Sequence, residues 1–253
     1  MQVVILAGGF GSRLSEETDL IPKPMVRIGQ DPIILHLMKF YASYGHTDFV
    51  IALGYKGHVI KDFFANYIRY RSDIRVNLAS QEIELITHTD DRWKITLIDT
   101  GEQTLTGGRL LRLRDYLEPE FMLTYGDGLS NVNLDSLYEF HKLNSKIGTV
   151  TAVRPPARFG SIEIKDEFVT SFSEKNPHNS GWINGGFFCF KREICDYIPG
   201  DDFSLEGKTM EDLVENHELV AFTHEGFWQP MDTLREKRIL ETLWEKGEAP
   251  WLR

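Results

Sequence analysis

Residues 3–14 read Val-Val-Ile-Leu-Ala-Gly-Gly-Phe-Gly-Ser-Arg-Leu. The four aliphatic residues that open this stretch form a run typical of a strand buried on both faces of a parallel sheet. The run passes directly into a loop with three glycines. Glycine lets a backbone approach a ligand closely, and successive backbone N–H groups form a concave anion site. The stretch therefore predicts a strand that ends in a phosphate-binding loop.

Two basic residues accompany this loop. Arg13 lies within it, and Lys23 stands a few residues later between Pro22 and Pro24. Proline fixes its own φ and biases the preceding residue toward extended geometry, so Lys23 has a stiff support. A rigid cation is suited to stabilising charge in a transition state. We expect both cations to bind a polyphosphate; the alternative for Lys23 is an exposed loop lysine.

The glycine spacing argues against other nucleotide-binding loops. A dinucleotide-binding fingerprint requires Gly-x-Gly-x-x-Gly, and here Gly9 and Gly11 are followed by Leu14 at the third position. A P-loop requires four residues between its glycines and then Gly-Lys-Ser/Thr, which this stretch does not have. A purely structural turn would not explain why three glycines stand beside an arginine.

The composition is that of an ordinary globular chain. With 253 residues and 42% hydrophobic content, we expect a single domain over 1–253. The formal net charge of −10 argues against nucleic-acid binding, although a local cluster of cations can still bind a small anion. Cys189 and Cys195 are interpreted as buried free thiols in a reducing compartment. Neither a signal peptide nor a membrane span is recognised, so we expect a cytoplasmic protein without a membrane partner.

Apolar periodicity predicts alternating strands and helices, which indicates an α/β fold with a mostly parallel sheet. Asp31 and Pro32 are expected to cap the first helix, and Asn133 a later one. The range 74–100 is rich in β-formers and is expected to include an antiparallel excursion. The predicted strands are 3–6, 49–53, 121–125, 148–153, 161–164, 169–173 and 185–190, and the predicted helices are 33–41, 57–70, 110–117, 134–143 and 232–246.

Two aspartates are candidate metal ligands. Asp127 lies between Gly126 and Gly128 at the end of a predicted strand, and Asp232 stands at the start of the last helix. Ligands of parallel sheets bind beyond the carboxyl ends of the strands, and Mg²⁺ takes one or two carboxylates together with substrate phosphates. The alternatives are a tight-turn aspartate for the first residue and a helix N-cap for the second.

A third group of polar residues follows the later strands. Glu174 and Lys175 come after the strand 169–173, and Asn184 opens the next one. A lysine and an asparagine there could bind a monophosphate and sugar hydroxyls. The alternatives are a surface ion pair and a turn asparagine. The eight histidines show no metal-ligand spacing, and we interpret them as non-catalytic.

Taken together, the motif of residues 8–14 and the Pro-Lys-Pro of residues 22–24 resemble those of the sugar nucleotidyltransferases. The resemblance covers essentially the whole chain. Thr-Gly-Gly-Arg-Leu at 106–110 and Trp-Gln-Pro-Met-Asp-Thr at 228–233 are similar to the cytidylyltransferase branch, which joins CTP and glucose 1-phosphate into a CDP-sugar and pyrophosphate. The resemblance implies a Rossmann-like nucleotidyltransferase fold, Mg²⁺ dependence and a homo-oligomer.

The resemblance also implies roles for individual residues. The glycines of the loop would wrap the nucleotide, Arg13 would bind its β and γ phosphates, and Lys23 would stabilise charge at the reacting phosphorus. The expected catalytic residues are Arg13, Lys23 and Asp127, the expected metal ligands are Asp127 and Asp232, and the expected substrate-binding residues are Leu6, Ala7, Gly8, Gly9, Gly11, Ser12, Thr106, Gly107, Gly108, Gly126, Glu174, Lys175, Asn184 and Gly185.

One segment departs from the family pattern. The family has Glu-Lys-Pro, whereas this chain has Glu174-Lys175-Asn176-Pro177, with the proline displaced by one position. That displacement leaves the identity of the sugar open. Another NTP or another sugar 1-phosphate is therefore the alternative within the enzyme class. A catalytically silent regulatory subunit is disfavoured because the expected cationic and acidic residues are all present.

Overall fold

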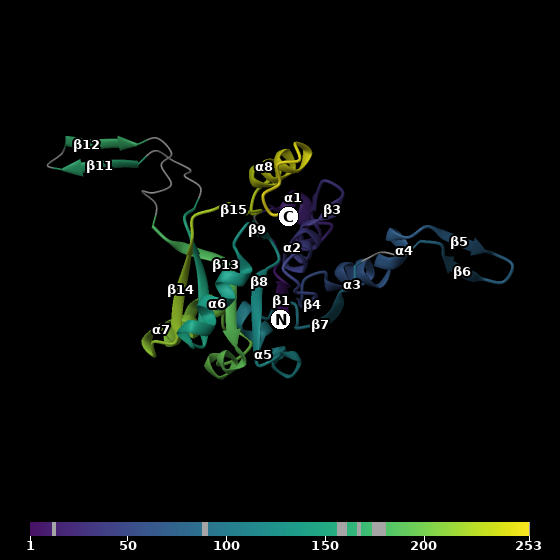
Figure 1. Cartoon of the computed structure of the whole chain (residues 1–253), viewed down its shortest axis with the longest axis horizontal. Coiled ribbons are helices and arrows are strands. Elements are labelled where there is room, and N and C mark those ends of the chain that lie inside the picture. Colours follow the sequence, from purple (N-terminus) through teal and green to yellow (C-terminus); the bar gives the residue numbers. More distant parts are fainter. Residues whose placement is uncertain (12–13, 88–90, 156–160, 166–167, 174–180, 253) are drawn as a thin grey trace.

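The computed structural model describes residues 1–252 apart from 12–13, 88–90, 156–160, 166–167 and 174–180. Within this part of the chain a seven-stranded sheet has the order β14-β10-β13-β8-β1-β4-β7 (Figure 1). Six strands are parallel and β13 alone is reversed, which confirms the predicted α/β class. The bounds are β1 Gln2–Ala7, β4 Asp48–Leu53, β7 Lys94–Asp99, β8 Glu120–Tyr125, β10 Gly148–Val153, β13 Ile183–Lys191 and β14 Leu219–His224.

Helices cover both faces of this sheet. Val3 and Ile5 of β1 are fully buried in a core that includes the apolar face of α2, whereas Val4 lies in a second core with Leu110 of α5. The continuous aliphatic run is thus explained by burial on both sides. The bounds are α1 Ser15–Thr18, α2 Ile33–Ala42, α3 Gly57–Ala65, α4 Tyr67–Arg71, α5 Thr106–Arg112, α6 Leu134–Asn144, α7 Met210–Glu215 and α8 Leu234–Glu245, and the shorter helical segments are η2 Lys23–Met25, η3 Arg114–Tyr116, η5 Arg192–Tyr197 and η6 Leu205–Thr209.

Two-stranded ribbons complete the described architecture. The β5–β6 hairpin and the β11–β12 ribbon project from the body of the molecule (Figure 1). The first of them confirms the expected antiparallel excursion, while β7 joins the main sheet as a parallel edge strand. The bounds are β2 Arg27–Ile28, β3 Asp31–Pro32, β5 Ile74–Asn77, β6 Glu82–Leu85, β9 Gly128–Ser130, β11 Ser161–Lys165, β12 Phe168–Ser173 and β15 Trp228–Pro230.

Several helix boundaries differ from the sequence prediction. The helix expected over 57–70 is interrupted at Asn66, and the one expected over 110–117 lies at 106–112. The Asp31 side chain does not cap α2, because it accepts a 2.6 Å hydrogen bond from Lys39 and forms an ion pair with Arg71. A buried carboxylate is stabilised better by two cations than by one backbone N–H. The Asn133 cap is confirmed, since its side chain accepts from Ser136 N.

The C-terminal segment is anchored in the core. Trp251 is 1% exposed, and its Nε1 donates to His36 Nδ1 over 3.2 Å. Because the indole only donates, His36 Nδ1 is an acceptor and Nε2–H donates to the carbonyl oxygen of Ile28 over 2.9 Å. The ring is therefore neutral, and burial holds its pKa below the ordinary value.

No helix among the described residues combines the length and the apolar character that a bilayer span requires.

Four buried or partly buried histidines predict that the fold is less stable in acid. Burial lowers the pKa of His36, His46, His141 and His224 below the ordinary value of 6.5. Below pH 6.5 the unfolded chain binds protons at these histidines, whereas in the folded chain they stay neutral to a lower pH. The contribution of this difference to the free energy of unfolding is present above pH 6.5 and is lost as the pH falls. We expect urea unfolding to give a smaller free energy of unfolding at pH 5.5 than at pH 7.5. An equal or larger value at pH 5.5 would contradict this.

Candidate active site

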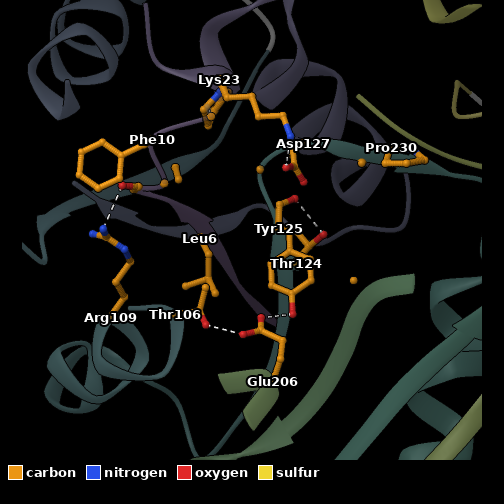
Figure 2. Close-up of a pocket in the computed structure, with 18 of the residues that line it drawn as sticks. Leu6, Phe10, Lys23, Thr106, Arg109, Thr124, Tyr125, Asp127, Glu206 and Pro230 are labelled. Carbon is orange, nitrogen blue, oxygen red and sulfur yellow. Dashed lines mark hydrogen bonds and ion pairs between the residues drawn. The ribbon is translucent and has the colours of Figure 1, made fainter. Parts of the chain in front are cut away.

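A pocket with a cavity volume of about 610 Å³ lies at the carboxyl ends of β1 and β8 (Figure 2). Strand β1 delivers the glycine loop to it, β8 delivers Tyr125 to Asp127, and the start of β13 forms another wall. Twelve of the residues expected from the sequence line this pocket: Leu6, Ala7, Gly8, Gly9, Gly11, Lys23, Thr106, Gly126, Asp127, Asn184, Gly185 and Asp232.

Two expected residues are not among those that line the pocket. Gly107 and Gly108 pack against the backbone of residues 201–205, and a Cβ on either would overlap that backbone. They allow close approach of α5 to this segment, and their expected role in substrate binding stays a prediction. Four further expected residues lie outside the described part of the chain: Ser12, Arg13, Glu174 and Lys175.

The centre of the site is an ammonium group between two carboxylates. Lys23 Nζ donates to Asp127 Oδ2 and to Asp232 Oδ1, each over 2.6 Å. The Lys23 side chain is only 10% exposed, whereas the two aspartates are about one-third and one-quarter exposed toward the pocket. The two carboxylates, 105 positions apart in sequence, thus converge on one cation.

Backbone pairing explains why these aspartates meet. Strand β9 directly follows Asp127 and pairs antiparallel with β15, which ends two residues before Asp232. Met231 N donates to the carbonyl oxygen of Asp127 over 2.8 Å, which closes the pair. Helix α8 is capped by Thr233 in a capping box with Glu236. The capping alternative for Asp232 is therefore wrong, and its carboxylate faces the pocket instead.

The electrostatic balance keeps Lys23 charged. Burial by itself would lower the pKa of Lys23, but the charges of Asp127 and Asp232 and their hydrogen bonds outweigh it, so the pKa stays above the ordinary value. A buried cation paired in this way keeps its proton throughout the neutral range.

The two aspartates fit a magnesium ion that is shared with a substrate. Their oxygens are hard ligands, and they lie close enough to contact the same cation. Among the described residues no group of three or more metal-ligating side chains is found. Mg²⁺ commonly takes only one or two carboxylates and completes its coordination with phosphates and water, so Asp127 and Asp232 are sufficient donors for that arrangement.

The glycine loop has the geometry of a ligand cradle. Gly11 has a φ of +65°, and its carbonyl oxygen accepts from Thr18 Oγ1 over 3.1 Å. Among the described residues, apart from its two chain neighbours, none has an atom within 4 Å of a Cβ placed on Gly9, which lines the pocket. Phe10 packs against Tyr55 with ring centroids 5.1 Å apart. The loop is thus held from outside while its backbone faces the cavity.

Arg109 holds the glycine loop through a hydrogen bond to Gly8, and the sequence did not mark it as a functional residue. Its guanidinium is buried and donates to five oxygens. One of them is the carbonyl oxygen of Gly8, at 2.9 Å. A Cβ on Gly8 or Gly54 would overlap the guanidinium, which explains both glycines. The other four oxygens are those of Leu53 O, Thr100 Oγ1, Gly101 O and Glu102 O.

Glu206 was also missed, because no local motif marks it. It lies on η6, lines the pocket, and accepts hydrogen bonds from Thr106 Oγ1, over 2.6 Å, and from the Tyr125 hydroxyl (Figure 2). Nearby, Trp228 Nε1 donates to the carbonyl oxygen of Gly185 over 2.7 Å, which fixes the start of β13. Only the folded chain brings these residues to the site.

Comparison with known proteins agrees with this geometry. A glycine loop that lines a pocket, a buried lysine and two converging carboxylates are parts that phosphoryl-type transfer can use. The family model described as nucleotidyl transferase matches residues 2–235, and the chain belongs to that family. It is 47% identical over 253 residues to the glucose-1-phosphate cytidylyltransferase of Salmonella typhimurium, and the aligned region covers 99% of this chain and 98% of that protein.

More distant relatives extend the comparison. The probable glucose-1-phosphate cytidylyltransferase of Bacillus subtilis is 39% identical over 253 residues, covering 99% of each chain. The crystal structure of HddC from Yersinia pseudotuberculosis superposes with a TM-score of 0.69 at 24% identity, covering 96% of this chain and 99% of that one. The latter similarity shows the fold alone, and it agrees with the α/β architecture described above.

Proposed function

We propose that this protein transfers a cytidylyl group from CTP to a sugar 1-phosphate, with glucose 1-phosphate as the acceptor, and releases pyrophosphate. The observation that carries the proposal is the convergence of Lys23, Asp127 and Asp232 beside the glycine loop. The full-length similarity to glucose-1-phosphate cytidylyltransferases supports the choice of nucleotide and sugar. The family model and the relatives together support a single nucleotidyltransferase domain.

The reaction is a direct displacement. An oxygen of the sugar 1-phosphate attacks the α-phosphorus of CTP, and the bond to the pyrophosphate oxygen breaks. Both substrates are anions, so the site must bring them together against their mutual repulsion. The backbone N–H groups of the glycine loop and Lys23 supply the positive potential, with Arg13 as an expected third contributor. Positioning and charge neutralisation then provide most of the rate enhancement.

We propose that Asp127 and Asp232 hold Mg²⁺ during this reaction. A divalent ion there would neutralise the phosphates and orient the leaving group. Asp127 and Asp232 would bind the ion, and Lys23 would balance their charge in the free enzyme. Glu174 and Lys175 remain proposals for the acceptor's hydroxyls and phosphate. Because the reaction consumes a nucleoside triphosphate, we also propose a cytoplasmic location.

The experiment that tests the function is a substrate matrix. Four NTPs are combined with a panel of sugar 1-phosphates, and pyrophosphate release is measured with Mg²⁺ and again with EDTA. We expect release with CTP and glucose 1-phosphate, and its loss in EDTA. Release with a different NTP or sugar would replace the proposed substrates. No release in any combination would favour the regulatory alternative.

We further propose a homo-oligomer in which the β5–β6 hairpin contacts a second copy of this chain. The cross-strand pairs Ile74–Leu85 and Val76–Ile83 share one face of the hairpin, and apart from half-buried Leu85 these side chains are exposed. Isolated two-stranded hairpins are marginally stable in water. An uncovered apolar ribbon that projects from the body therefore needs a partner surface.

A groove beside the hairpin could receive the same ribbon from the second copy. It is lined by aromatic residues, among them Phe64, Tyr67 and Trp93, has a cavity volume of about 680 Å³, and includes Leu85 itself. The apolar hairpin face and the groove are thus continuous. Such an arrangement makes each copy donate and accept the same element, which closes a symmetric contact.

Sedimentation of the full chain tests this proposal. We expect a species larger than the 29.2 kDa monomer, and a shift toward monomer in a Val76→Lys/Ile83→Glu double variant. The control is Arg75→Gln on the opposite, polar face of the hairpin, which should leave the assembly intact. A wild-type monomer, or an assembly unaffected by the double substitution, would count against this interface.

A further inference from the structure

A chain of hydrogen bonds crosses one wall of the pocket. The Glu206 carboxylate accepts from Thr106 Oγ1 over 2.6 Å and from the Tyr125 hydroxyl. The Tyr125 oxygen in turn accepts from Asn184 Nδ2 over 3.2 Å. All four side chains line the same cavity as the glycine loop, yet they come from η6, α5, β8 and β13. Strands β8 and β13 are already paired in the sheet, and α5 already packs beside η6, so Glu206 adds a side-chain link between these two pairs of elements.

The direction of each hydrogen bond in this chain is fixed. Burial and then the negative charge of Glu206 raise the pKa of Tyr125, so its proton stays on the phenol and is donated to the carboxylate. The phenol oxygen is then free to accept only from the Asn184 amide. Asn184 Oδ1 accepts from Gly186 N over 2.8 Å. Both ends of the amide are thereby assigned, and Nδ2 keeps a second hydrogen that has no acceptor among the described residues.

The position of Asn184 indicates which substrate it meets. In the sheet order β13-β8-β1-β4-β7, the glycine loop follows β1, while Asn184 lies on β13, on the other side of β8 and Asp127. A ligand group beside Asn184 is thus across the reaction centre from the nucleotide loop. A carboxylate such as Glu206 repels phosphate, so this wall suits neutral hydroxyl groups.

We propose that Glu206 is a positioning residue for the acceptor: acting through Tyr125, it sets the Asn184 amide so that its second N–H binds a hydroxyl of the sugar 1-phosphate. This inference rests on the proposed function, and it assigns to Glu206 and Tyr125 a role in acceptor specificity. Neither residue needs to touch the reacting phosphates.

Tyr125→Phe tests the connection most directly, because it removes one hydroxyl and leaves the Glu206–Thr106 hydrogen bond in place. A lost hydrogen bond is equivalent to about a tenfold change in an equilibrium. We expect the KM for glucose 1-phosphate to rise about tenfold in Tyr125→Phe and in Glu206→Gln, with the KM for CTP changed less than about twofold. The matched control is Glu211→Gln, an exposed glutamate on α7, which should alter neither constant.

Deoxy acceptors distinguish positioning from a general structural effect. Each enzyme is assayed with a set of monodeoxy glucose 1-phosphates. One analogue lacks the hydroxyl that Asn184 binds, and with that analogue wild type and Tyr125→Phe should have equal kcat/KM. With the other analogues the tenfold difference should persist. A merely structural role would instead lower kcat/KM by the same factor for every acceptor, because the two changes would be independent.

The remaining outcomes overturn the inference. A rise confined to the KM for CTP would mean that Glu206 acts on the nucleotide, and an equal rise in both constants, or in neither, would mean that the chain does not select the acceptor. CTP binding by calorimetry confirms that each variant is folded. If wild type itself makes no CDP-sugar in the substrate matrix, the proposed function fails, which is distinct from a failure of the variants to separate the two KM values.

Discussion

Replacing Lys23 with alanine should reduce kcat at least about 10²-fold, the usual cost of losing a group that stabilises transition-state charge. In the folded chain the Lys23 ammonium is bonded to Asp127 and Asp232 at 2.6 Å each. Its removal would leave two neighbouring carboxylates without this counterion, and it would take a fixed positive charge away from the site where two anionic substrates must meet. The measurement is pyrophosphate release with CTP and glucose 1-phosphate at saturating Mg²⁺.

A second lysine provides the matched control. Lys94 pairs with Asp48 over 3.0 Å, but both lie at the amino ends of their strands, at the opposite edge of the sheet from the pocket. Lys94→Ala should therefore keep normal turnover. Near-normal turnover in Lys23→Ala would refute its catalytic role.

Replacing Arg109 with leucine should lower the free energy of unfolding by about 1–3 kcal/mol, the usual cost of removing a charged donor from buried hydrogen bonds. The guanidinium donates to five oxygens. The carbonyl oxygens of Gly8 and Leu53 keep another donor, Tyr55 N and Thr100 respectively, but every hydrogen bond from the charged group is lost. The loss of these charge-assisted hydrogen bonds carries most of this cost. Since one of them belongs to the glycine loop, we also expect weaker binding of CTP.

Urea unfolding and calorimetric CTP binding measure the two effects. Arg109→Lys should rescue little, because one ammonium cannot reproduce the planar fork of donors. The control is Arg114→Leu, just beyond the same helix, where the arginine forms an exposed ion pair with Asp196 and substitution should change stability little. A stable Arg109→Leu protein that binds CTP normally would show that the loop does not depend on this contact.

Local sequence was sufficient for much of the site. The strand before Gly8 and the loop glycines could be predicted because each depends on neighbouring residues alone. The extended geometry expected for Lys23 before Pro24 is wrong, because Lys23 lies in the short helix η2, which is closed by hydrogen bonds from Met25 N to Pro22 O and from Val26 N to Lys23 O. The rule that ligands bind beyond the carboxyl ends of parallel strands then placed Asp127 correctly at the pocket. The roles of Arg13, Glu174 and Lys175 stay predictions, since those residues lie outside the described part of the chain.

Other predictions failed where side chains had competing partners. Asp31 could have capped α2, but two cations bind its carboxylate instead. Asp232 could have capped α8, but the capping box of Thr233 and Glu236 takes that function one residue later. Gly107 and Gly108 were expected to bind substrate, which stays a prediction, and a reason for these glycines that the sequence did not show is the packing of α5 on residues 201–205. Sequence spacing shows what a residue is able to do, and not which of several partners it meets.

The sequence by itself determined the alternation of strands and helices, the glycine loop after β1 and the chemical identity of the charged residues, because hydrophobic periodicity and glycine placement act over short stretches. Only the tertiary structure decided that the β9–β15 pair brings Asp127 and Asp232 to Lys23, and that Arg109 and Glu206 belong to the same pocket. Those contacts join residues about 100 or more positions apart or elements without a motif. Their formation depends on burial and backbone pairing across the whole sheet, which no local pattern specifies.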